Sequence, residues 1–274
     1  MSVFYNVARF VSRAFGPNSA VVRAVRPISE RVLRSVVGRR GLAWEINGVP
    51  CRINPQFRAQ FARYYDAALA AILQKEINSG QVCLDVGANI GVWVIQFASL
   101  VGPTGRVVAF EPNPGARAVL EEHIGLNDLG SVVRVVPAAI GAVPGEVAFF
   151  AAGADGMSRI GEPNPLLAER VVTMTVRVTT LDSWCRENAV RPDWLFIDIE
   201  GYEGHALAGA AETIRTVGPN LGIVVEMHPT LWSASGTTRD EVAARIADLG
   251  RRAVPLTGQA DPFGEYGHVR LEPL

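Results

Sequence analysis

A short apolar segment that runs through a glycine-rich turn into a helical pattern constrains this chain more than any other feature. The segment is Val82–Val86, and the turn Gly87-Ala-Asn-Ile-Gly91 follows it. Apolar residues then recur at helical spacing from 92 to 101. A strand that passes through such a turn into a helix is the ligand-binding side of a βαβ unit. We therefore expect a parallel sheet with a ligand crevice at this turn.

The turn has residues suited to close contact with a ligand. Gly87 and Gly91 allow backbone conformations and contacts that a Cβ would prevent. The helix that begins here is expected to present free N–H groups and the positive end of its dipole. Asp85, at the end of the strand, is predicted to add a carboxylate to the crevice. Such a carboxylate attracts an ammonium group and repels a pyrophosphate.

A dinucleotide site is the first alternative, and the spacing speaks against it. Asn89 stands where a G-x-G-x-x-G fingerprint has its second glycine. The next predicted strand, 107–110, ends at Glu111, about twenty residues after the turn, where an acid accepts hydrogen bonds from ribose hydroxyls. Acids at both strand ends fit S-adenosylmethionine (SAM), which carries an ammonium, has free ribose hydroxyls and lacks a pyrophosphate.

Three ordered motifs carry a family resemblance. The segments Asp85-Val-Gly-Ala-Asn-Ile-Gly91, Val107-Val-Ala-Phe-Glu-Pro-Asn-Pro114 and Phe196-Ile-Asp-Ile-Glu-Gly-Tyr202 resemble the FkbM family of SAM-dependent methyltransferases. The similarity runs from roughly residue 69 to residue 250. It implies an α/β, Rossmann-like class I methyltransferase with a mostly parallel seven-stranded sheet and helices on both faces.

The crevice and the resemblance together give a predicted set of cofactor-binding residues. Ala138 and Ala139 follow the strand 132–136, and in the family this region lines the adenine pocket. Ser158 resembles a Gly-x-x-Ser element near the family's active site. Phe196 is a departure, because the family usually has Lys there. The predicted SAM-binding residues are Asp85, Gly87, Asn89, Gly91, Glu111, Pro112, Asn113, Ala138, Ala139 and Asp198.

Acids and a histidine follow two later apolar strands. Asp198 and Glu200 follow the strand that begins at residue 194, while Glu226 ends the strand 221–226 and His228 comes two residues later. Ligands of open α/β sheets bind beyond the carboxyl ends of the strands, so these side chains should meet in the crevice. Methyl transfer to a hydroxyl needs a base. We hypothesise that Asp198 or His228 is that base and that Glu200 and Glu226 orient the substrate.

Other uses of these residues remain open. Asp198, Glu226 and His228 could hold Mg²⁺ through oxygen ligands and water, but the spacing is not specific to a metal, so the sequence assigns no metal site. The resemblance implies a hydroxyl acceptor on a sugar, glycolipid or polyketide-type small molecule. The alternatives are a NAD(P)-dependent oxidoreductase on a Rossmann sheet and a SAM-binding scaffold without turnover, which the Phe196 departure would suit.

Composition narrows the class of protein. Of 274 residues, 49% are hydrophobic and 19% charged, which allows a sizeable core, and the net charge of −1 carries no nucleic-acid signature. Three cysteines, Cys51, Cys83 and Cys185, lie far apart without a C-x-x-C motif. We expect neither a disulfide framework nor a zinc site, and therefore a reducing compartment such as the cytoplasm.

The N-terminal part is predicted to be a separate extension, residues 1–78, ahead of a methyltransferase domain at 79–274. Residues 1–40 hold eight arginines and one acid, with apolar residues at roughly helical spacing. This helical arm could contact an anionic membrane or a partner, serve as an organellar transit peptide, or simply dock on the catalytic domain. No stretch is long enough to span a membrane. A hairpin is predicted near 42–54, around Asn47-Gly48.

The remaining pattern alternates strands and helices. Helices are predicted at 62–78, 114–126, 202–216 and 237–249, with another opening at 179–184. Extended segments are predicted at 145–150 and 171–178, with a functional loop at 153–160 between them. The segments 252–256 and 266–271 should form a closing antiparallel pair.

Overall fold

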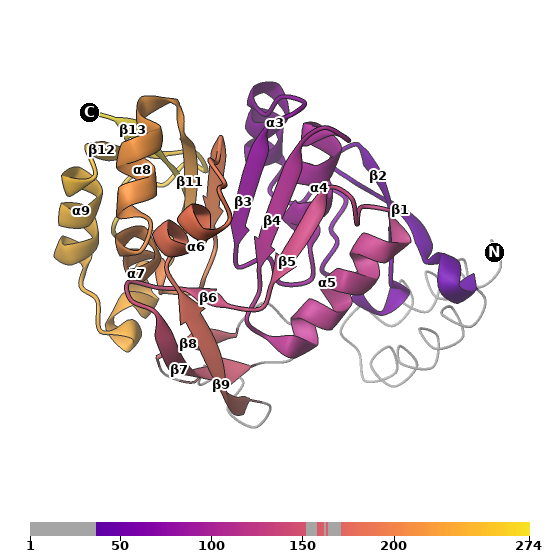
Figure 1. Ribbon diagram of the computed structural model, residues 1–274, viewed down its shortest axis with the longest axis horizontal. Coiled ribbons are helices and arrows are strands. Elements are labelled where there is room, and N and C mark those ends of the chain that lie inside the picture. The colour runs from indigo at the N-terminus through magenta and orange to yellow at the C-terminus, as the bar shows by residue number, and fades with distance from the viewer. Residues whose placement is uncertain (1–36, 152–157, 162, 164–170) are drawn as a thin grey trace.

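The computed structural model describes residues 37–151, 158–161, 163 and 171–274. Its centre is a seven-stranded sheet in the order β12-β13-β11-β10-β3-β4-β5 (Figure 1). The five strands from β11 to β5 are parallel neighbours, and β13 is antiparallel to both β11 and β12. The strands are β3 (Val82–Val86), β4 (Arg106–Phe110), β5 (Val133–Val136), β10 (Trp194–Ile197), β11 (Gly222–Met227), β12 (Arg251–Pro255) and β13 (Gly267–Pro273).

Helices cover both faces of this sheet. Successive strand residues point to opposite sides, and here the residues on both sides are apolar and buried. On β3, Leu84 belongs to one buried cluster and Cys83 to the other. The Cys83 face packs against α3 (Ala67–Glu76), α4 (Val92–Val101) and α5 (Pro114–Leu126). The Leu84 face packs against α6 (Leu181–Glu187), α7 (Glu203–Ala208), α8 (Ala211–Val217) and α9 (Arg239–Asp248). The chain therefore has the mostly parallel, Rossmann-like fold predicted from its sequence.

The order of the strands reverses between β3 and β10. These two strands are parallel neighbours, with Asp85 opposite Phe196. The chain leaves β3 toward β4 on one side and returns later to place β10 on the other. Such a switch point separates the connecting loops and opens a crevice at the carboxyl ends of the strands. The ends of β3 and β10 therefore both face this crevice.

A second, four-stranded sheet lies beside the carboxyl ends of the main sheet (Figure 1). The predicted segments 145–150 and 171–178 are its antiparallel centre. Its strands are β6 (Ala139–Ile140), β7 (Gly145–Ala151), β8 (Arg159–Ile160) and β9 (Val172–Thr179). Residues 153–157 of the predicted functional loop lie outside the described residues.

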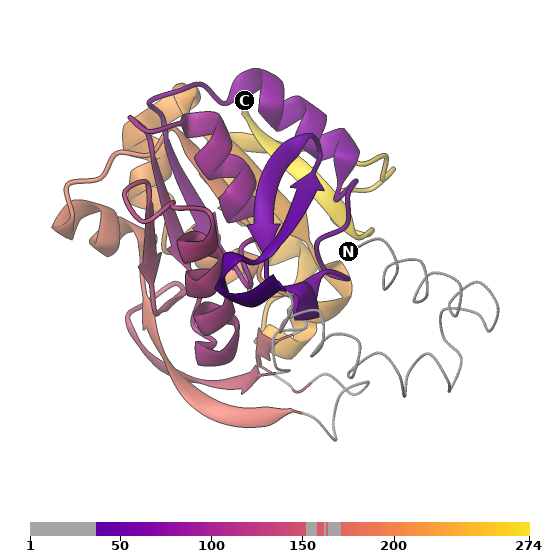
Figure 2. The same ribbon diagram turned by 90° about the vertical axis from the view of Figure 1, so that its right-hand side faces the viewer.

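A two-stranded hairpin packs on the α4 and α5 side of the molecule (Figure 2). It consists of β1 (Leu42–Ile46) and β2 (Val49–Ile53), and Asn47 and Gly48 form its turn with positive φ. Ile46 and Ile53 are fully buried in a third apolar cluster, which also contains Ile90 of the glycine-rich turn. The hairpin therefore shares an apolar cluster with the glycine-rich turn that follows β3. Residues 1–36 of the arm predicted at 1–40 lie outside the described residues.

Two predicted helices differ from the observed ones. The helix expected at 62–78 begins only at Ala67, because the preceding backbone is used by the hairpin: the Asn47 N–H donates to the Arg63 carbonyl and the Asn47 side chain to the Tyr65 carbonyl. The helix expected at 202–216 is broken at Gly209, where a Cβ would lie 2.0 Å from the Gly141 carbonyl oxygen. The chain therefore packs closely against Gly141 at this point, and the predicted helix is divided into α7 and α8.

Smaller features complete the fold. Short 3-10 helices connect larger elements at Gly38–Arg40, Pro55–Phe57, Gly218–Asn220 and Pro229–Ser235. The three cysteines are buried and free. Within the described residues, no helix has both the length and the apolar character that crossing a membrane requires.

Candidate active site

A crevice lies beyond the carboxyl ends of β3, β4 and β10, at the switch point of the sheet. Its wall also includes Phe149, Ser158 and Arg159 from the smaller sheet and its connection. The predicted site residues that line it are Gly87, Asn89, Glu111, Pro112, Asn113, Ala138, Ala139, Asp198 and Glu200. The fold thus brings residues from four separate segments to one cavity.

The glycine-rich turn is held tightly between β4 and β10. Gly87 has a φ of 96°, and a Cβ there would lie 1.8 Å from the carbonyl oxygen of Asp198. Asn89 also has a positive φ, which asparagine tolerates better than most residues. A glycine is required at 87 both for the conformation and for the contact.

Four N–H groups of this turn donate to protein acceptors. That the helix beginning at Val92 presents its first N–H groups to a ligand stays a prediction. The N–H groups of Gly87 and Ala88 both donate to the carbonyl of Phe110. The Gly91 N–H donates to Ala88. The Asn89 N–H donates to the carboxylate of Glu111, at 2.7 Å. The turn therefore lacks the row of free N–H groups that binds a pyrophosphate.

Glu111 is the acid at the ribose position, and the structure fixes its carboxylate. Its two oxygens accept hydrogen bonds from the N–H groups of Asn89 and Asn113, both at 2.7 Å. The residue is 5% exposed and lines the crevice. Burial raises the pKa of Glu111 to about 7, although the two N–H donors act in the opposite direction. Each carboxylate oxygen keeps a lone pair for a hydroxyl donor.

Two predicted cofactor residues lie outside the crevice wall. Asp85 is 1% exposed, and one of its carboxylate oxygens has no hydrogen-bond partner among the described residues. It lies in the strand with Phe196 and Ala109 as its neighbours, one position before Val86, which does line the crevice. Burial, and then the charge of Glu111, raise the pKa of Asp85 to about 8. Gly91 caps α4 and packs against Leu120 instead.

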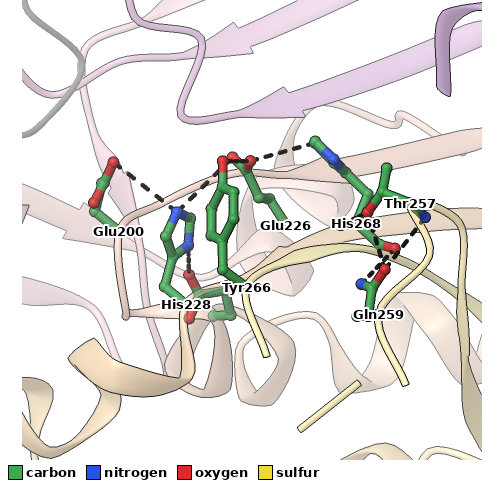
Figure 3. A network of polar contacts seen from close by, with 8 residues as sticks. Glu200, Glu226, His228, Thr257, Gln259, Tyr266 and His268 are labelled. Carbon is green, nitrogen blue, oxygen red and sulfur yellow. Dashed lines mark hydrogen bonds and ion pairs between the residues drawn. The ribbon is translucent and has the colours of Figure 1, made fainter. Parts of the chain in front are cut away.

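An acidic cluster lies at the ends of β10 and β11 (Figure 3). Two of its members, Asp198 and Glu200, line the crevice. His228 lies between carboxylates: its Nε2 atom is 3.9 Å from Glu200 and 3.8 Å from Glu226. Its Nδ1 atom donates to Glu203 at 2.7 Å. Burial lowers the pKa of His228, but the hydrogen bond and charge of Glu203 outweigh burial and raise it to about 9. The sequence predicted that Asp198, Glu200, Glu226 and His228 would meet, and the structure brings them together.

One carboxylate oxygen of Asp198 and one of Glu226 lie within 4.8 Å of each other. Burial and the charge of Glu226 raise the pKa of Asp198 well above its usual range. Glu200 lies two residues after Asp198, and its backbone is in the left-handed conformation, with a φ of 41°. Burial raises its pKa as well.

Sequence reasoning missed three members of this cluster. Glu203 is fully buried and also accepts hydrogen bonds from Trp232 and from the Gly201 N–H. Tyr266 donates its hydroxyl to Glu226. His268, for which the sequence shows no partner, lies with its Nε2 atom 3.6 Å from Glu226. Tyr266 and His268 come from the closing antiparallel strand region, and only the fold shows that this strand borders β11.

Phe196 and Ser158, which stand out in the sequence, and the nearby His205 make the following contacts. Phe196 is 3% exposed and packs between Trp93 and Phe97, with ring centroids 5.2 and 5.5 Å away. His205 stacks on Tyr202, and its Nε2 atom is 3.0 Å from the Ser235 carbonyl oxygen, outside the crevice wall. Ser158 does line the crevice and accepts a hydrogen bond from the Asn113 side chain.

Fold and crevice together define the class I, Rossmann-like methyltransferases: a parallel sheet closed by an antiparallel strand, with a ligand cavity at the switch point. The family model for the methyltransferase FkbM domain matches residues 85–253. This match covers more than half of the chain, and the protein belongs to the FkbM methyltransferase family.

Solved structures with similar folds include three of interest. A methyltransferase FkbM from Methylobacillus flagellatus KT is 16% identical, with a TM-score of 0.44, over 70% of this chain and 43% of that one. The match thus spans less than half of that protein. A putative rRNA methylase from Clostridium thermocellum is 12% identical (TM-score 0.47; 76% and 94% covered).

A SAM-dependent O-methyltransferase from Thermotoga maritima is 13% identical (TM-score 0.46; 80% and 70% covered). Similarity at this level says nothing of the substrate of the present chain. No curated protein matches it.

Proposed function

We propose that this chain transfers a methyl group from SAM to a hydroxyl group on a sugar, glycolipid or polyketide-type small molecule. Membership of the FkbM family supports methyl transfer. One observation carries the rest: a single crevice is lined by Glu111 and the small residues Ala138 and Ala139, and also by the acids Asp198 and Glu200. A cofactor position and a proton acceptor therefore share one cavity.

The residues present fit SAM. Glu111 offers a fixed carboxylate to the ribose hydroxyls, and the alanines leave room for a flat base. Asp85 supplies a buried carboxylate oxygen without a partner among the described residues, which an ammonium could satisfy through water. Gly87 keeps the wall free of a Cβ. When bound, SAM supplies an electrophilic methyl group on a sulfonium sulfur.

Glu200 is the member of the acidic cluster best placed to take the proton of the acceptor hydroxyl. Its side chain is 24% exposed and lines the crevice, whereas Glu226 and His228 are 8% and 7% exposed and lie behind it. His228 lies between Glu203, Glu200 and Glu226, and Asp198 lies beside the buried Glu226. We therefore assign the base to Glu200, in place of Asp198 or His228 as the sequence suggested.

The reaction in this arrangement is an in-line displacement. The Glu200 carboxylate accepts the hydroxyl proton while the oxygen attacks the methyl carbon, and the carbon–sulfur bond breaks with its electron pair left on sulfur. Alignment of the three reacting atoms by the crevice supplies much of the rate enhancement. Positioned general bases typically add about 10²–10⁴-fold.

Binding of a nicotinamide dinucleotide fits the crevice poorly. The N–H groups of Gly87, Ala88 and Asn89 are already donated to protein acceptors, so they cannot bind a pyrophosphate. The carboxylates of Glu111 and Asp198 in the wall would repel its charges. These observations favour SAM over NAD(P).

The test is a transfer assay with radiolabelled SAM and a panel of glycosides, glycolipids and polyketide-type alcohols. We expect methylated product on a hydroxyl, and we expect Glu200→Gln to lower kcat by about 10²–10⁴-fold while leaving the affinity for S-adenosylhomocysteine unchanged. Glu121→Gln, an exposed substitution on α5, is the matched control and should keep full activity.

Full turnover of Glu200→Gln would remove Glu200 from the role of base. Methylation of amines but of no alcohol would contradict the acceptor class. Tight binding of S-adenosylhomocysteine without transfer to any acceptor would favour the non-catalytic scaffold.

A further inference from the structure

Three side chains at the ends of two neighbouring strands bring donor atoms close together. Asp198 follows β10, and Glu226 and His228 lie at the end of β11. One carboxylate oxygen from each acid and one imidazole nitrogen all lie within 4.8 Å of one another. Glu226 and His228 are more than nine-tenths buried. The position adjoins Glu200 in the crevice wall.

We propose that Asp198, Glu226 and His228 bind one divalent cation beside the acceptor end of the crevice. The site itself follows from the geometry of these side chains, while the role of the cation in methyl transfer rests on the function proposed above.

The orientation of His228 is that of a metal ligand. Histidines that bind metals usually donate their other ring N–H to a carboxylate, which fixes the ring and its tautomer. His228 donates Nδ1–H to Glu203, which Trp232 and the Gly201 N–H hold in place. Nε2 therefore faces Glu226 and Glu200 (Figure 3). Glu203 is fully buried and does not itself line the crevice.

His268 provides a separate observation that points to a missing ligand. It is 3% exposed, and its Nε2 atom has no hydrogen-bond partner among the described residues. That atom lies 3.6 Å from the Oε1 atom of Glu226 (Figure 3). Its backbone is bonded to Thr257 and Gln259, and its ring lies 6.1 Å from that of Phe196, between centroids. A water bound to the cation, or the cation itself, would give Nε2 a partner.

The charge of the cluster also favours a cation. Asp198, Glu200, Glu203 and Glu226 lie together, with ion pairs to His228 and His268. The charge of Arg159 also acts on Glu200, so four acids face three basic side chains. Buried carboxylates without enough positive charge are costly, and proteins commonly resolve this by binding a metal. A divalent ion would neutralise two of these charges.

The donor set suggests which ions would bind. Two carboxylates and one imidazole suit Mn²⁺ and related divalent ions, and three further positions would remain for water or substrate oxygens. Ligand distances of about 2.1 Å allow donor atoms to be roughly 4.2 Å apart at most. The observed limit of 4.8 Å requires the side chains to move inward only slightly.

In methyl transfer the cation would hold the acceptor oxygen and make its hydroxyl more acidic. Glu200 would still take the proton, because it is not among the three ligands. The oxygen then attacks the methyl carbon, and the sulfur leaves with the electron pair of the broken bond. No additional reactant is needed.

The test uses the full-length protein stripped of metal by a chelator and titrated with Mn²⁺ under electron paramagnetic resonance. We expect one bound Mn²⁺ per chain. Its pulsed spectrum should show coupling to a histidine nitrogen, a signature that requires no variant.

Variants then locate the ion. Glu226→Gln and His228→Gln should weaken Mn²⁺ binding at least tenfold, and Glu203→Gln about 10–100-fold through the histidine. Glu121→Gln should bind like the wild type. Retained affinity for S-adenosylhomocysteine would show that each variant is folded.

No saturable Mn²⁺ binding, no nitrogen coupling, or equal binding by all variants would overturn the metal site. These results are independent of the methyltransferase proposal. A protein that binds S-adenosylhomocysteine and transfers methyl groups at full rate in excess chelator would keep its proposed function and lose the cation. A protein that binds Mn²⁺ at these residues but ignores the cofactor would keep the cation site and lose the function.

Discussion

Glu111 shows how a single buried carboxylate can make cofactor binding depend on pH. Its pKa of about 7 arises from burial and is opposed by the N–H groups of Asn113 and Asn89. Ribose hydroxyls donate to the ionised form, so binding should favour loss of the proton. We expect the affinity for S-adenosylhomocysteine to rise from pH 6 to pH 8, at most about tenfold per pH unit below the pKa.

Calorimetry in buffers of different ionisation enthalpy would measure both the affinity and the proton released. Glu111→Gln should weaken binding and remove most of the pH dependence, whereas Glu121→Gln should change neither. An affinity that stays flat, or falls, between pH 6 and 8 would contradict this role of Glu111.

Glu203 shows what residue-level reading of a sequence misses. Nothing in the segment Gly201-Tyr-Glu-Gly204 marks this glutamate as the partner of His228, 25 positions away. Its role depends on the side chain turning into the core from the first turn of α7. Asp198, Glu200 and Glu226 were predictable because each lies at or just beyond the end of an apolar strand, and parallel strands end at the same edge.

At the scale of elements, the break between α7 and α8 can be tested with a pair of glycines. Gly209 lies against the Gly141 carbonyl, where a Cβ would approach to 2.0 Å. Gly125 is in the last turn of α5, and a Cβ added there would meet no atom within 4 Å. Gly209→Ala should lower the free energy of unfolding by about 2 kcal/mol or more, because the backbone must shift.

Gly125→Ala should raise the free energy of unfolding by about 0.5–1 kcal/mol, because alanine loses less entropy than glycine when a helix forms. Urea denaturation of both variants measures the difference. Equal stability of the two variants would mean that the contact at Gly209 does not decide where the helix ends.

Elements with strong local signals were predictable. Asn113 caps α5 with Pro114 in the first turn, and that helix spans the predicted residues 114–126. The antiparallel closing pair and the Asn47-Gly48 hairpin also lie where turn residues and apolar runs place them. Two helix predictions were wrong, at residues 62–66 and at Gly209. Contacts with distant segments determine the backbone at both places, and a local sequence pattern does not contain those contacts.

At the scale of the whole molecule, buried acids should make stability fall as pH rises. The pKa of Asp85 is raised to about 8 by burial and by Glu111. An acid whose folded pKa is raised contributes stability below its unfolded pKa of about 3.9 and loses it as pH rises through 8. We expect the Tm of the ligand-free protein to fall between pH 6 and pH 9.

The Tm of the Asp85→Asn variant should fall less between pH 6 and pH 9, because the amide does not ionise. Asp248→Asn, at an exposed position in α9, is the control and should follow the wild type. A Tm that rises with pH, or equal slopes for wild type and Asp85→Asn, would contradict the assignment. Thermal unfolding followed by circular dichroism is sufficient to decide this.

The basic arm is a separate question at this scale. Contact of residues 1–40 with an anionic membrane stays a prediction, as does the division of the chain at 78–79, since residues 1–36 lie outside the described residues. A full-length protein that ignored anionic liposomes at low salt would contradict the membrane contact.

Calorimetry with S-adenosylhomocysteine, beside NAD and NADP, tests the central claim most directly. We predict saturable binding of the sulfur ligand alone, one per chain, because Glu111 is poised for ribose and the N–H groups of Gly87, Ala88 and Asn89 are already donated to protein acceptors. Binding of a nicotinamide dinucleotide without S-adenosylhomocysteine would contradict the proposed cofactor and the assignment of the crevice.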